Sequence, residues 1–402
     1  MDAIRLLKDL IALPSVNPMG RAISGPEFFE GRVTEYLLTF FARLGVPAQR
    51  IEVVPGRADV IARPGRANVI ARFDNPASPI TLLFDAHQDT VPVDGMTIAP
   101  FDPIERDGRI YGRGACDVKG GMAAMLSAFA RLVAARPPQA ANVIVSCTCD
   151  EEAGAMGIDD LVKLWRDPSR KGSFLERPPD VAVIVEPTEL DVVVAHKGAT
   201  RWKIRTRGRA CHSSDPSQGV NAIYRMARVV ECLEDFASRL PSQVKPHPLC
   251  GSATLSVGLI QGGISVNTVP DDCLIEVDRR VIPGEDATGV MSQVENFLRA
   301  RLDFEFEMLP PWIRAPALPD DVNLPWADRL LEYVRPVVGR GEKVGVQYGT
   351  HASRTAAGGV PSVVFGPGSI AQAHTKDEWI ETRQLELAAE VYYRFAAEPS
   401  WT

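Results

Sequence analysis

The chain has 402 residues, a formal net charge of −7 at pH 7 and 45% hydrophobic residues. This length exceeds what one ordinary hydrophobic core needs and favours two domains, and the composition is typical of a globular protein. The acidic balance and the lack of a long basic block argue against nucleic acid as a partner.

The first residues do not have the pattern of a signal peptide, because Ile4, Leu7, Leu10 and Ile11 recur at helical spacing between charged residues. No apolar run approaches the roughly 18 residues of a transmembrane helix, so we expect no membrane association. The seven cysteines are odd in number and scattered, which favours free thiols in a reducing compartment. We therefore expect a cytoplasmic protein.

Short apolar runs rich in branched residues alternate with helical stretches in much of the chain. The segment Gly120–Ala135 has apolar residues at helical spacing and predicts a crossover helix. The alternation is typical of an α/β domain with a mostly parallel sheet. The predicted buried strands are Ile80–Phe84, Val143–Cys149, Val181–Val185 and Val363–Phe365.

The pattern changes after about residue 197. Basic residues at 201, 203 and 205 alternate with Trp202, Ile204 and Thr206, which predicts a half-exposed strand. We interpret its basic face as a solvated face or a charged edge strand rather than an anion site. A helix and two strands, Ala253–Ile260 and Cys273–Val281, follow. We expect an inserted α+β domain at 198–310, flanked by the two parts of the first domain at 1–197 and 311–402.

Candidate metal ligands follow the predicted strands. Because ligands collect at the carboxyl ends of strands in open α/β sheets, side chains far apart in the sequence are expected to converge there. Imidazoles and carboxylates together suit zinc, with cobalt or manganese as possible substitutes. The candidates are His87 and Asp89 in FDAHQDTVP, Asp117 in YGRGACDVKGG, Glu151 and Glu152 in TCDEEAG, Glu186 in VEPT, and His374 in GPGSIAQAH.

With these motifs the sequence resembles the zinc-dependent metallopeptidase and amidohydrolase family of acetylornithine deacetylase, succinyl-diaminopimelate desuccinylase, aminoacylase and glutamate-releasing carboxypeptidase. The resemblance extends from PSVNP at 14–18 to His374. It is strongest to the acetylornithine deacetylases, through EPT at 186–188, AHKG at 195–198 and HSSDPSQGVNAI at 212–223.

The resemblance implies a site for two zinc ions. Asp117 would bridge both ions, His87 and Glu186 would complete one position, and Glu152 and His374 would complete the other. It also implies a cis peptide bond between Asp117 and Val118.

The resemblance assigns further roles around the metals. Glu151 would be the general base, and Asp89 would hydrogen-bond the ring of His87. In the inserted domain, which would act as a lid and dimerisation domain, His212 would stabilise the oxyanion in the partner's site. Asn267 and Arg280 would contact the substrate, although a turn cap and a surface arginine are equally good interpretations of these two residues.

These assignments imply a homodimeric hydrolase that cleaves the amide bond of a small N-acyl amino acid. A dipeptidase or carboxypeptidase of the same family is the alternative, although Glu at position 186 accompanies the acylase and carboxypeptidase types and disfavours an aminopeptidase. A catalytically inactive binding protein is a second alternative. A serine hydrolase is disfavoured because the chain has no Gly-x-Ser-x-Gly motif.

One position departs from the family pattern. Family members often carry an acidic residue where this chain has His351, in YGTHAS at 348–353. The histidine could tune the site, contact substrate or pack as a neutral side chain, and we favour packing.

Overall fold

The computed structural model describes residues 2–23, 25–54, 65–167, 169–170 and 172–398. The contacts between residues divide the chain into two compact units. The first consists of Met1–Val194, Asp320–Val344 and Thr350–Thr402, and the second of Ala195–Pro319 and Gly345–Gly349. No helix in the described ranges is long and apolar enough to cross a membrane.

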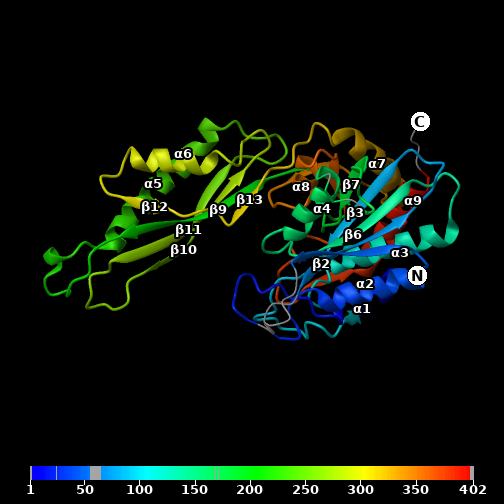
Figure 1. Cartoon of the computed structure of the whole chain (residues 1–402), viewed down its shortest axis with the longest axis horizontal. Coiled ribbons are helices and arrows are strands. Elements are labelled where there is room, and N and C mark those ends of the chain that lie inside the picture. The colour runs from blue at the N-terminus through cyan, green and yellow to red at the C-terminus, as the bar shows by residue number, and fades with distance from the viewer. Residues whose placement is uncertain (1, 24, 55–64, 168, 171, 399–402) are drawn as a thin grey trace. The chain divides into compact units, whose positions relative to one another are not determined.

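The first unit is built on an eight-stranded sheet (Figure 1). The pairs formed by the four central strands are parallel, while the pairs β1–β2, β2–β6 and β15–β8 are antiparallel. The strands follow one another across the sheet in the order β1 (Ala48–Val54), β2 (Arg66–Phe73), β6 (Asn142–Thr148), β3 (Thr81–His87), β7 (Val181–Ile184), β15 (Ser362–Val364), β8 (Val192–His196) and β14 (Lys343–Val346). The expected α/β fold with a largely parallel central sheet is confirmed.

Helices pack on one another and on this sheet. The expected crossover helix is α3 (Lys119–Ala135), which is buried nearly all round and packs against α1 (Ala3–Ile11) and α9 (Thr382–Ala397). The other helices are α2 (Gly31–Arg43), α4 (Met156–Arg166), α7 (Leu324–Val338) and α8 (Ala352–Ala357). A small sheet in the order β16 (Trp379–Glu381), β5 (Arg109–Tyr111) and β4 (Ile104–Arg106) completes the unit.

Strand β3 is longer than the sequence predicts. We expected it to end at Phe84, yet the parallel pairing with β6 continues to His87. The Asp85 carboxylate is fully buried and accepts hydrogen bonds from Ser146 Oγ (2.5 Å) and Thr148 Oγ1 (3.2 Å) on β6. Because these hydroxyls satisfy the carboxylate, the strand continues past a buried acid.

The second unit contains a five-stranded sheet with helices α5 (Ala222–Gln243) and α6 (Val290–Arg299). Its core includes Trp202, Ile204, Met226 and Leu233, which come from both the sheet and α5. The strand order is β10 (Thr254–Gly262), β11 (Asp272–Val281), β9 (Gly198–Arg207) and β12 (Phe306–Met308), and β13 (Ile313–Ala315) also pairs with β9.

The basic strand is not at an edge, so the edge-strand alternative is wrong, whereas its basic side chains are partly exposed as a solvated face would be. Strand β9 lies between β11 and the pair β12 and β13. Its basic residues face acids of β11, with Arg201–Asp278 at 3.4 Å and Lys203–Glu276 at 2.8 Å. Opposite charges across neighbouring strands stabilise their pairing, and this pairing accounts for the alternation.

The second unit also extends beyond the return expected at residue 311. The chain pairs with β9 before the prolines at 310 and 311, through β12, and again after them, through β13. The unit therefore continues to Pro319.

Candidate metal centre

The ends of the central strands bring three candidate ligands together. One ligand atom from each of His87, Asp117 and Glu152 lies within 4.8 Å of the others. His87 is the last residue of β3, Glu152 follows β6, and the parallel pairing of His87 with Thr148 places both strand ends at the same sheet edge. Asp117 lies just before α3 and reaches this edge from the loop.

Asp117 lies between two histidines. Its Oδ1 is 3.0 Å from His87 Nε2, and its Oδ2 is 3.2 Å from His374 Nε2. His374 Nε2 is also 3.3 Å from Glu152 Oε2. A carboxylate that offers one oxygen to each of two imidazole-lined positions has the geometry of a bridging ligand. The Asp117–Val118 peptide bond is cis, as expected.

The pKa values of the candidate ligands are shifted because several buried carboxylates lie close together. Burial, together with the charge of Asp117, raises the pKa of Glu152 to about 8 and also raises that of Glu186, which follows β7. Burial acts to raise the pKa of Asp117 as well, but hydrogen bonds from His374 and His87 hold it below its usual range. The pKa of His374 rises to about 10 because of its hydrogen bonds to Asp117 and Glu152. Such a site favours added positive charge.

The donor set fits divalent zinc. Glu152 Oε1 is buried and has no hydrogen-bond partner among the residues that the structure describes. A buried carboxylate oxygen without a donor is costly, and a cation would satisfy it. Zinc accepts imidazole nitrogen and carboxylate oxygen together.

Asp89 acts differently from expectation. His87 Nδ1 lies 2.9 Å from the main-chain oxygen of Asp89 and 3.7 Å from its carboxylate, so the main chain orients the ring. The carboxylate instead accepts the backbone N–H groups of Glu151 (3.0 Å) and Glu152 (3.2 Å). Asp89 therefore holds the loop that carries both glutamates.

Glu151 is adjacent to a candidate ligand but faces different neighbours. Its carboxylate has no hydrogen-bond partner within the described ranges, whereas Glu152 lies close to His374. Burial raises the pKa of Glu151, and the nearby imidazoles of His87 and His351 act in the opposite direction. A raised pKa and a free carboxylate suit a group that carries protons.

Comparison with known proteins places this site in a family. Residues 83–398 match the model described as Peptidase family M20/M25/M40. The chain belongs to this family. An acetylornithine deacetylase from Vibrio campbellii is 33% identical over 374 residues, which cover 90% of each chain. The chain is accordingly a hydrolase that acts on amide bonds.

Solved structures share the fold over nearly their whole length. An M20 family metallo-carboxypeptidase from Sulfolobus solfataricus aligns with a TM-score of 0.75 and 19% identity over 99% of both chains. A Bacillus subtilis protein described as a dinuclear metal binding peptidase from the M20 family aligns with a TM-score of 0.67 and 15% identity, over 98% of this chain and 96% of that one. At these identities the likeness establishes the fold.

A buried glutamate supports Asp117 and was not predicted from the sequence. Glu378 Oε1 accepts the backbone N–H of Asp117 (2.9 Å) and of Cys116 (2.8 Å), and its Oε2 accepts from Arg113 (2.7 Å) and Gly114 N (2.8 Å). Glu378, from the C-terminal part of this M20 chain, therefore fixes the turn before α3. The motif around His374 ends four residues before Glu378, but nothing in the sequence indicates this distant pairing.

A second unpredicted cluster lies behind Asp89. Arg66 contacts Glu30 and Asp150, the latter at 2.5 Å, and all three side chains are buried. Asn17 Nδ2 donates to Asp150 (3.0 Å) and Asp89 (2.8 Å). Two of these residues lie in motifs that the sequence analysis singled out, Asn17 in PSVNP and Asp150 in TCDEEAG. These motifs were the sequence signal from which the cluster could have been found.

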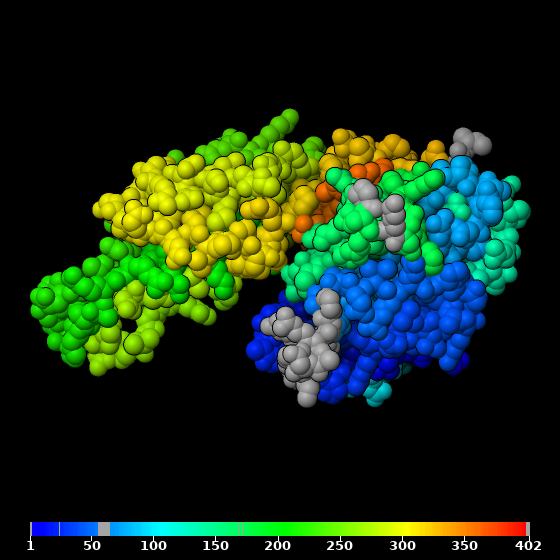
Figure 2. Space-filling view, viewed as in Figure 1, coloured from blue at the N-terminus to red at the C-terminus, as the bar shows by residue number. Residues whose placement is uncertain are grey.

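The remaining candidates lie in the second unit, and the structure separates them. His212 and Asn267 are exposed on neighbouring loops, with a bridge between His212 and Thr268 and a hydrogen bond from Ser213 N to Asn267 O (3.0 Å). Figure 2 shows the green and yellow-green surface of these loops. Arg280 lies near the other end of β11, roughly 26 Å along the strand from Asp272 at about 3.3 Å per residue, and donates from Nε to Asp278 (3.1 Å).

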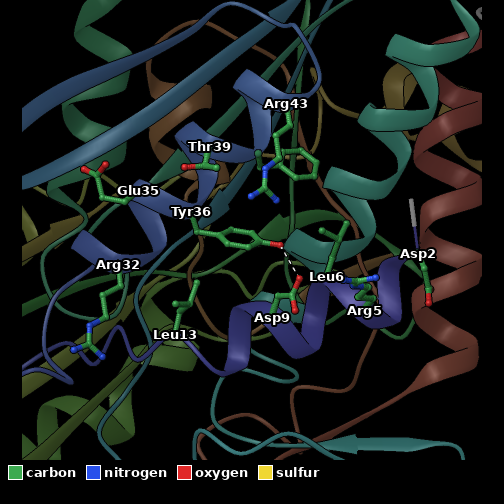
Figure 3. Close-up of a pocket in the computed structure, with 11 residues that line it drawn as sticks. Asp2, Arg5, Leu6, Asp9, Leu13, Arg32, Glu35, Tyr36, Thr39 and Arg43 are labelled. Carbon is green, nitrogen blue, oxygen red and sulfur yellow. Dashed lines mark hydrogen bonds between the residues drawn. The ribbon is translucent and has the colours of Figure 1, made fainter.

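A separate groove of about 670 Å³ lies between α1 and α2 (Figure 3). The Tyr36 hydroxyl donates to Asp9 (3.2 Å) in this groove, and Arg5 and Arg43 lie nearby. The described residues that line it include no histidine or cysteine and none of the predicted site residues. Among its described lining residues the groove therefore offers no imidazole or thiol that could bind a metal.

Proposed function

We propose that this M20 hydrolase uses two zinc ions to remove the acyl group from a small N-acyl amino acid, as the name of its acetylornithine deacetylase relatives suggests. The observation that carries the proposal is the position of Asp117 between His87 and His374, with one carboxylate oxygen facing each imidazole. Glu186 would complete the position of His87, and Glu152 that of His374. Cobalt or manganese could replace zinc.

Glu151 is the proton carrier of the proposed reaction. Bound zinc would lower the pKa of water and polarise the carbonyl of the substrate. Glu151 takes a proton from the attacking water and delivers it to the amine nitrogen, which is too basic to leave as an anion. Asp89 holds the backbone of Glu151, so the carboxylate starts from a fixed position.

The contacts of His212 support a role in stabilising an oxyanion, because both Ser214 Oγ (2.8 Å) and the backbone N–H of Ser214 lie against Nδ1 and leave Nε2 free of these contacts. The backbone N–H of Ser214 donates to His212 Nδ1 (3.2 Å), which favours Nδ1 as the acceptor nitrogen. In a neutral ring the proton then lies on Nε2, which can donate to a developing negative charge. We assign this role to His212, and substrate contacts to Asn267 and Arg280.

We further propose a homodimer in which one protomer supplies His212 to its partner's site. His212 and Asn267 lie at one end of the lid sheet and Arg280 at the other, too far apart for one copy to place all three on a small substrate. Strand β10 is an edge strand, and its Leu259 and Ile260 are 55% and 57% exposed. An apolar edge strand favours pairing with another copy.

The seven cysteines support a cytoplasmic location. All of them lie in the described part of the chain and all are free thiols. Free thiols are typical of a reducing compartment.

A substrate panel tests the activity. We expect zinc-loaded protein to hydrolyse N-acetylornithine or another N-acyl amino acid faster than dipeptides, with two zinc ions bound per chain. Faster cleavage of dipeptides would identify a dipeptidase instead. A protein that binds zinc but cleaves no member of a panel of N-acetyl, N-succinyl, N-formyl and dipeptide compounds would support a binding role and refute the proposal.

A further inference from the structure

Asn17 lies in the segment that follows α1 and runs beside the end of β3. Its backbone N–H donates to Thr90 O (2.8 Å), Thr90 N donates to Ser15 O (3.1 Å), and Ser15 Oγ donates to Gln88 O (2.7 Å). Asn17 is 1% exposed, so its side-chain amide needs partners inside the protein. The backbone bonds fix the position from which this side chain projects.

The side-chain nitrogen of Asn17 joins two loops. Its Nδ2 donates to Asp89 Oδ2 (2.8 Å), in the loop after β3, and to Asp150 Oδ1 (3.0 Å), in the loop after β6. An amide nitrogen carries two hydrogens, so these two bonds use its whole donor capacity. The side-chain oxygen accepts the backbone N–H of Met19 (3.0 Å). The nitrogen therefore couples the two loops, while the oxygen stabilises the turn of its own segment.

The two carboxylates that Asn17 joins are buried and carry the same charge, so they repel each other unless donors lie between them. Arg66 Nη1 is 2.5 Å from Asp150 Oδ1, but its Nη2 is 4.0 Å from Asp89 Oδ2, too far for a hydrogen bond. Among the described residues, Asn17 is the side chain that donates to both carboxylates. It therefore determines how closely the two loops approach.

Asp89 relates this link to both candidate metal positions. Its main-chain oxygen lies 2.9 Å from His87 Nδ1, and its carboxylate accepts the backbone N–H groups of Glu151 and Glu152. His87 belongs to one proposed zinc position and Glu152 to the other. A shift of Asp89 would therefore change the spacing between ligands that come from different strands.

We propose that Asn17 is a positioning residue that fixes the spacing of the two zinc positions by tying the loop after β3 to the loop after β6. This inference rests on the proposed zinc site and adds a residue outside it. Asn17 makes no hydrogen bond to a candidate ligand in the described ranges, and it acts through Asp89 and Asp150. Hydrogen bonds that orient metal ligands in this indirect way typically contribute 10- to 100-fold to metal affinity or activity.

Asn17→Asp tests the side-chain nitrogen. The aspartate has the same size and keeps an oxygen for Met19, but it cannot donate to Asp89 or Asp150. We expect the dissociation constant of the weaker-bound zinc ion to rise by about 10- to 100-fold, measured by competition with a chelator in the absence of substrate. The charge of the new carboxylate alone would have the opposite effect, because a negative charge near a divalent cation tightens its binding.

Asn142→Asp is the matched control at the other end of β6. Asn142 Nδ2 donates to Ser78 O and Ile80 O (both 3.0 Å), and its Oδ1 accepts the backbone N–H of Asn75 (2.9 Å). The same chemical change should lower the urea midpoint there and leave zinc affinity within about twofold of wild type. Asn17→Ala removes the donor without adding a charge and should weaken zinc binding as Asn17→Asp does. It also provides the test if Asn17→Asp does not fold.

Unchanged or tighter zinc binding in Asn17→Asp would overturn the proposal, as would unchanged zinc binding in Asn17→Ala. An equal loss of zinc affinity in Asn142→Asp would also overturn it, because general destabilisation would then explain the effect. If wild-type protein bound no zinc, or bound zinc and cleaved no compound of the substrate panel, the proposed function would fail instead. The two failures are thus distinguishable.

Discussion

Glu151 and Glu152 are neighbours in the sequence but have different surroundings. The Glu152 carboxylate lies 3.3 Å from His374 and has a buried oxygen that a cation would satisfy. Among the described residues the Glu151 carboxylate has no such contact, and Asp89 holds its backbone. The same residue type can therefore bind a metal at one position and carry protons at the next.

This difference predicts the effect of Glu151→Gln. The amide keeps the size of the side chain but cannot take a proton from water, so kcat should fall by at least about 10²-fold while both zinc ions remain bound. Metal analysis and steady-state kinetics on the same preparation check this. Loss of zinc, with activity restored on reloading, would instead make Glu151 a ligand. Glu152→Gln is the matched comparison, and it should lose zinc.

His196 predicts a pH dependence of stability. Burial lowers its pKa to about 4, whereas the unfolded chain has the ordinary value of 6.5. Between these values the unfolded state binds more protons, so the contribution is fully present above pH 6.5 and is lost as the pH falls towards 4. The loss amounts to about 3 kcal/mol.

Urea unfolding at pH 7.5 and pH 5 measures this contribution. We expect His196→Gln to reduce the difference between the two pH values, and His247→Gln, at a partly exposed histidine, to leave it unchanged. An equal pH dependence in wild type and His196→Gln would contradict the assignment.

At the scale of elements, the turn before α3 is tightly packed near the site. A Cβ atom at Gly120 would lie 2.3 Å from the carbonyl oxygen of Ala115 and 2.8 Å from Ile380 Cδ1. The first of these neighbours is backbone, so relief requires movement of the segment that ends in Asp117. The position of a candidate bridging ligand thus depends on a glycine in the next helix.

Gly120→Ala should therefore lower both stability and zinc affinity. Overpacking of this kind costs about 1–3 kcal/mol, measurable as a lower urea midpoint. Gly31→Ala in α2 is the control, because its Cβ would have no atom within 4 Å, and it should be neutral or slightly stabilising. Full zinc binding and wild-type stability in Gly120→Ala would contradict this prediction and show that the turn moves at little cost to accommodate the Cβ atom.

At the scale of the whole molecule, the dimer proposal predicts complementation. His212→Ala and Glu151→Gln should each be nearly inactive with zinc intact, since one oxyanion donor contributes about 10²–10³ in kcat. A mixed dimer would contain one site with both residues native if His212 acts in its partner's site. Random mixing should then restore about a quarter of wild-type activity.

Subunit exchange must be shown independently, for example by co-purification of two differently tagged copies. Exchange without recovered activity would place His212 in the site of its own chain. Replacing the exposed Leu259 and Ile260 of β10 by aspartate should abolish both dimerisation and complementation.

The sequence by itself determined the α/β class, and it predicted an inserted segment and a set of candidate ligands at the strand ends. These features are local: a run of branched residues predicts a buried strand, and the residue after it is at the sheet edge whichever strands are neighbours. The central parallel sheet then brought His87, Asp117, Glu152 and His374 together.

Only the tertiary structure decided which buried polar groups meet. Asp85 looks like a loop residue until Ser146 and Thr148 are placed beside it, and the basic strand looks like an edge until β11 supplies its acids. The same holds for Glu378 with the turn at Asp117, and for the ring of His351, whose Nδ1 lies 2.9 Å from Asp85 Oδ2. These pairings depend on the register of distant strands, and a polar residue carries no local sign of the partner that makes its burial possible.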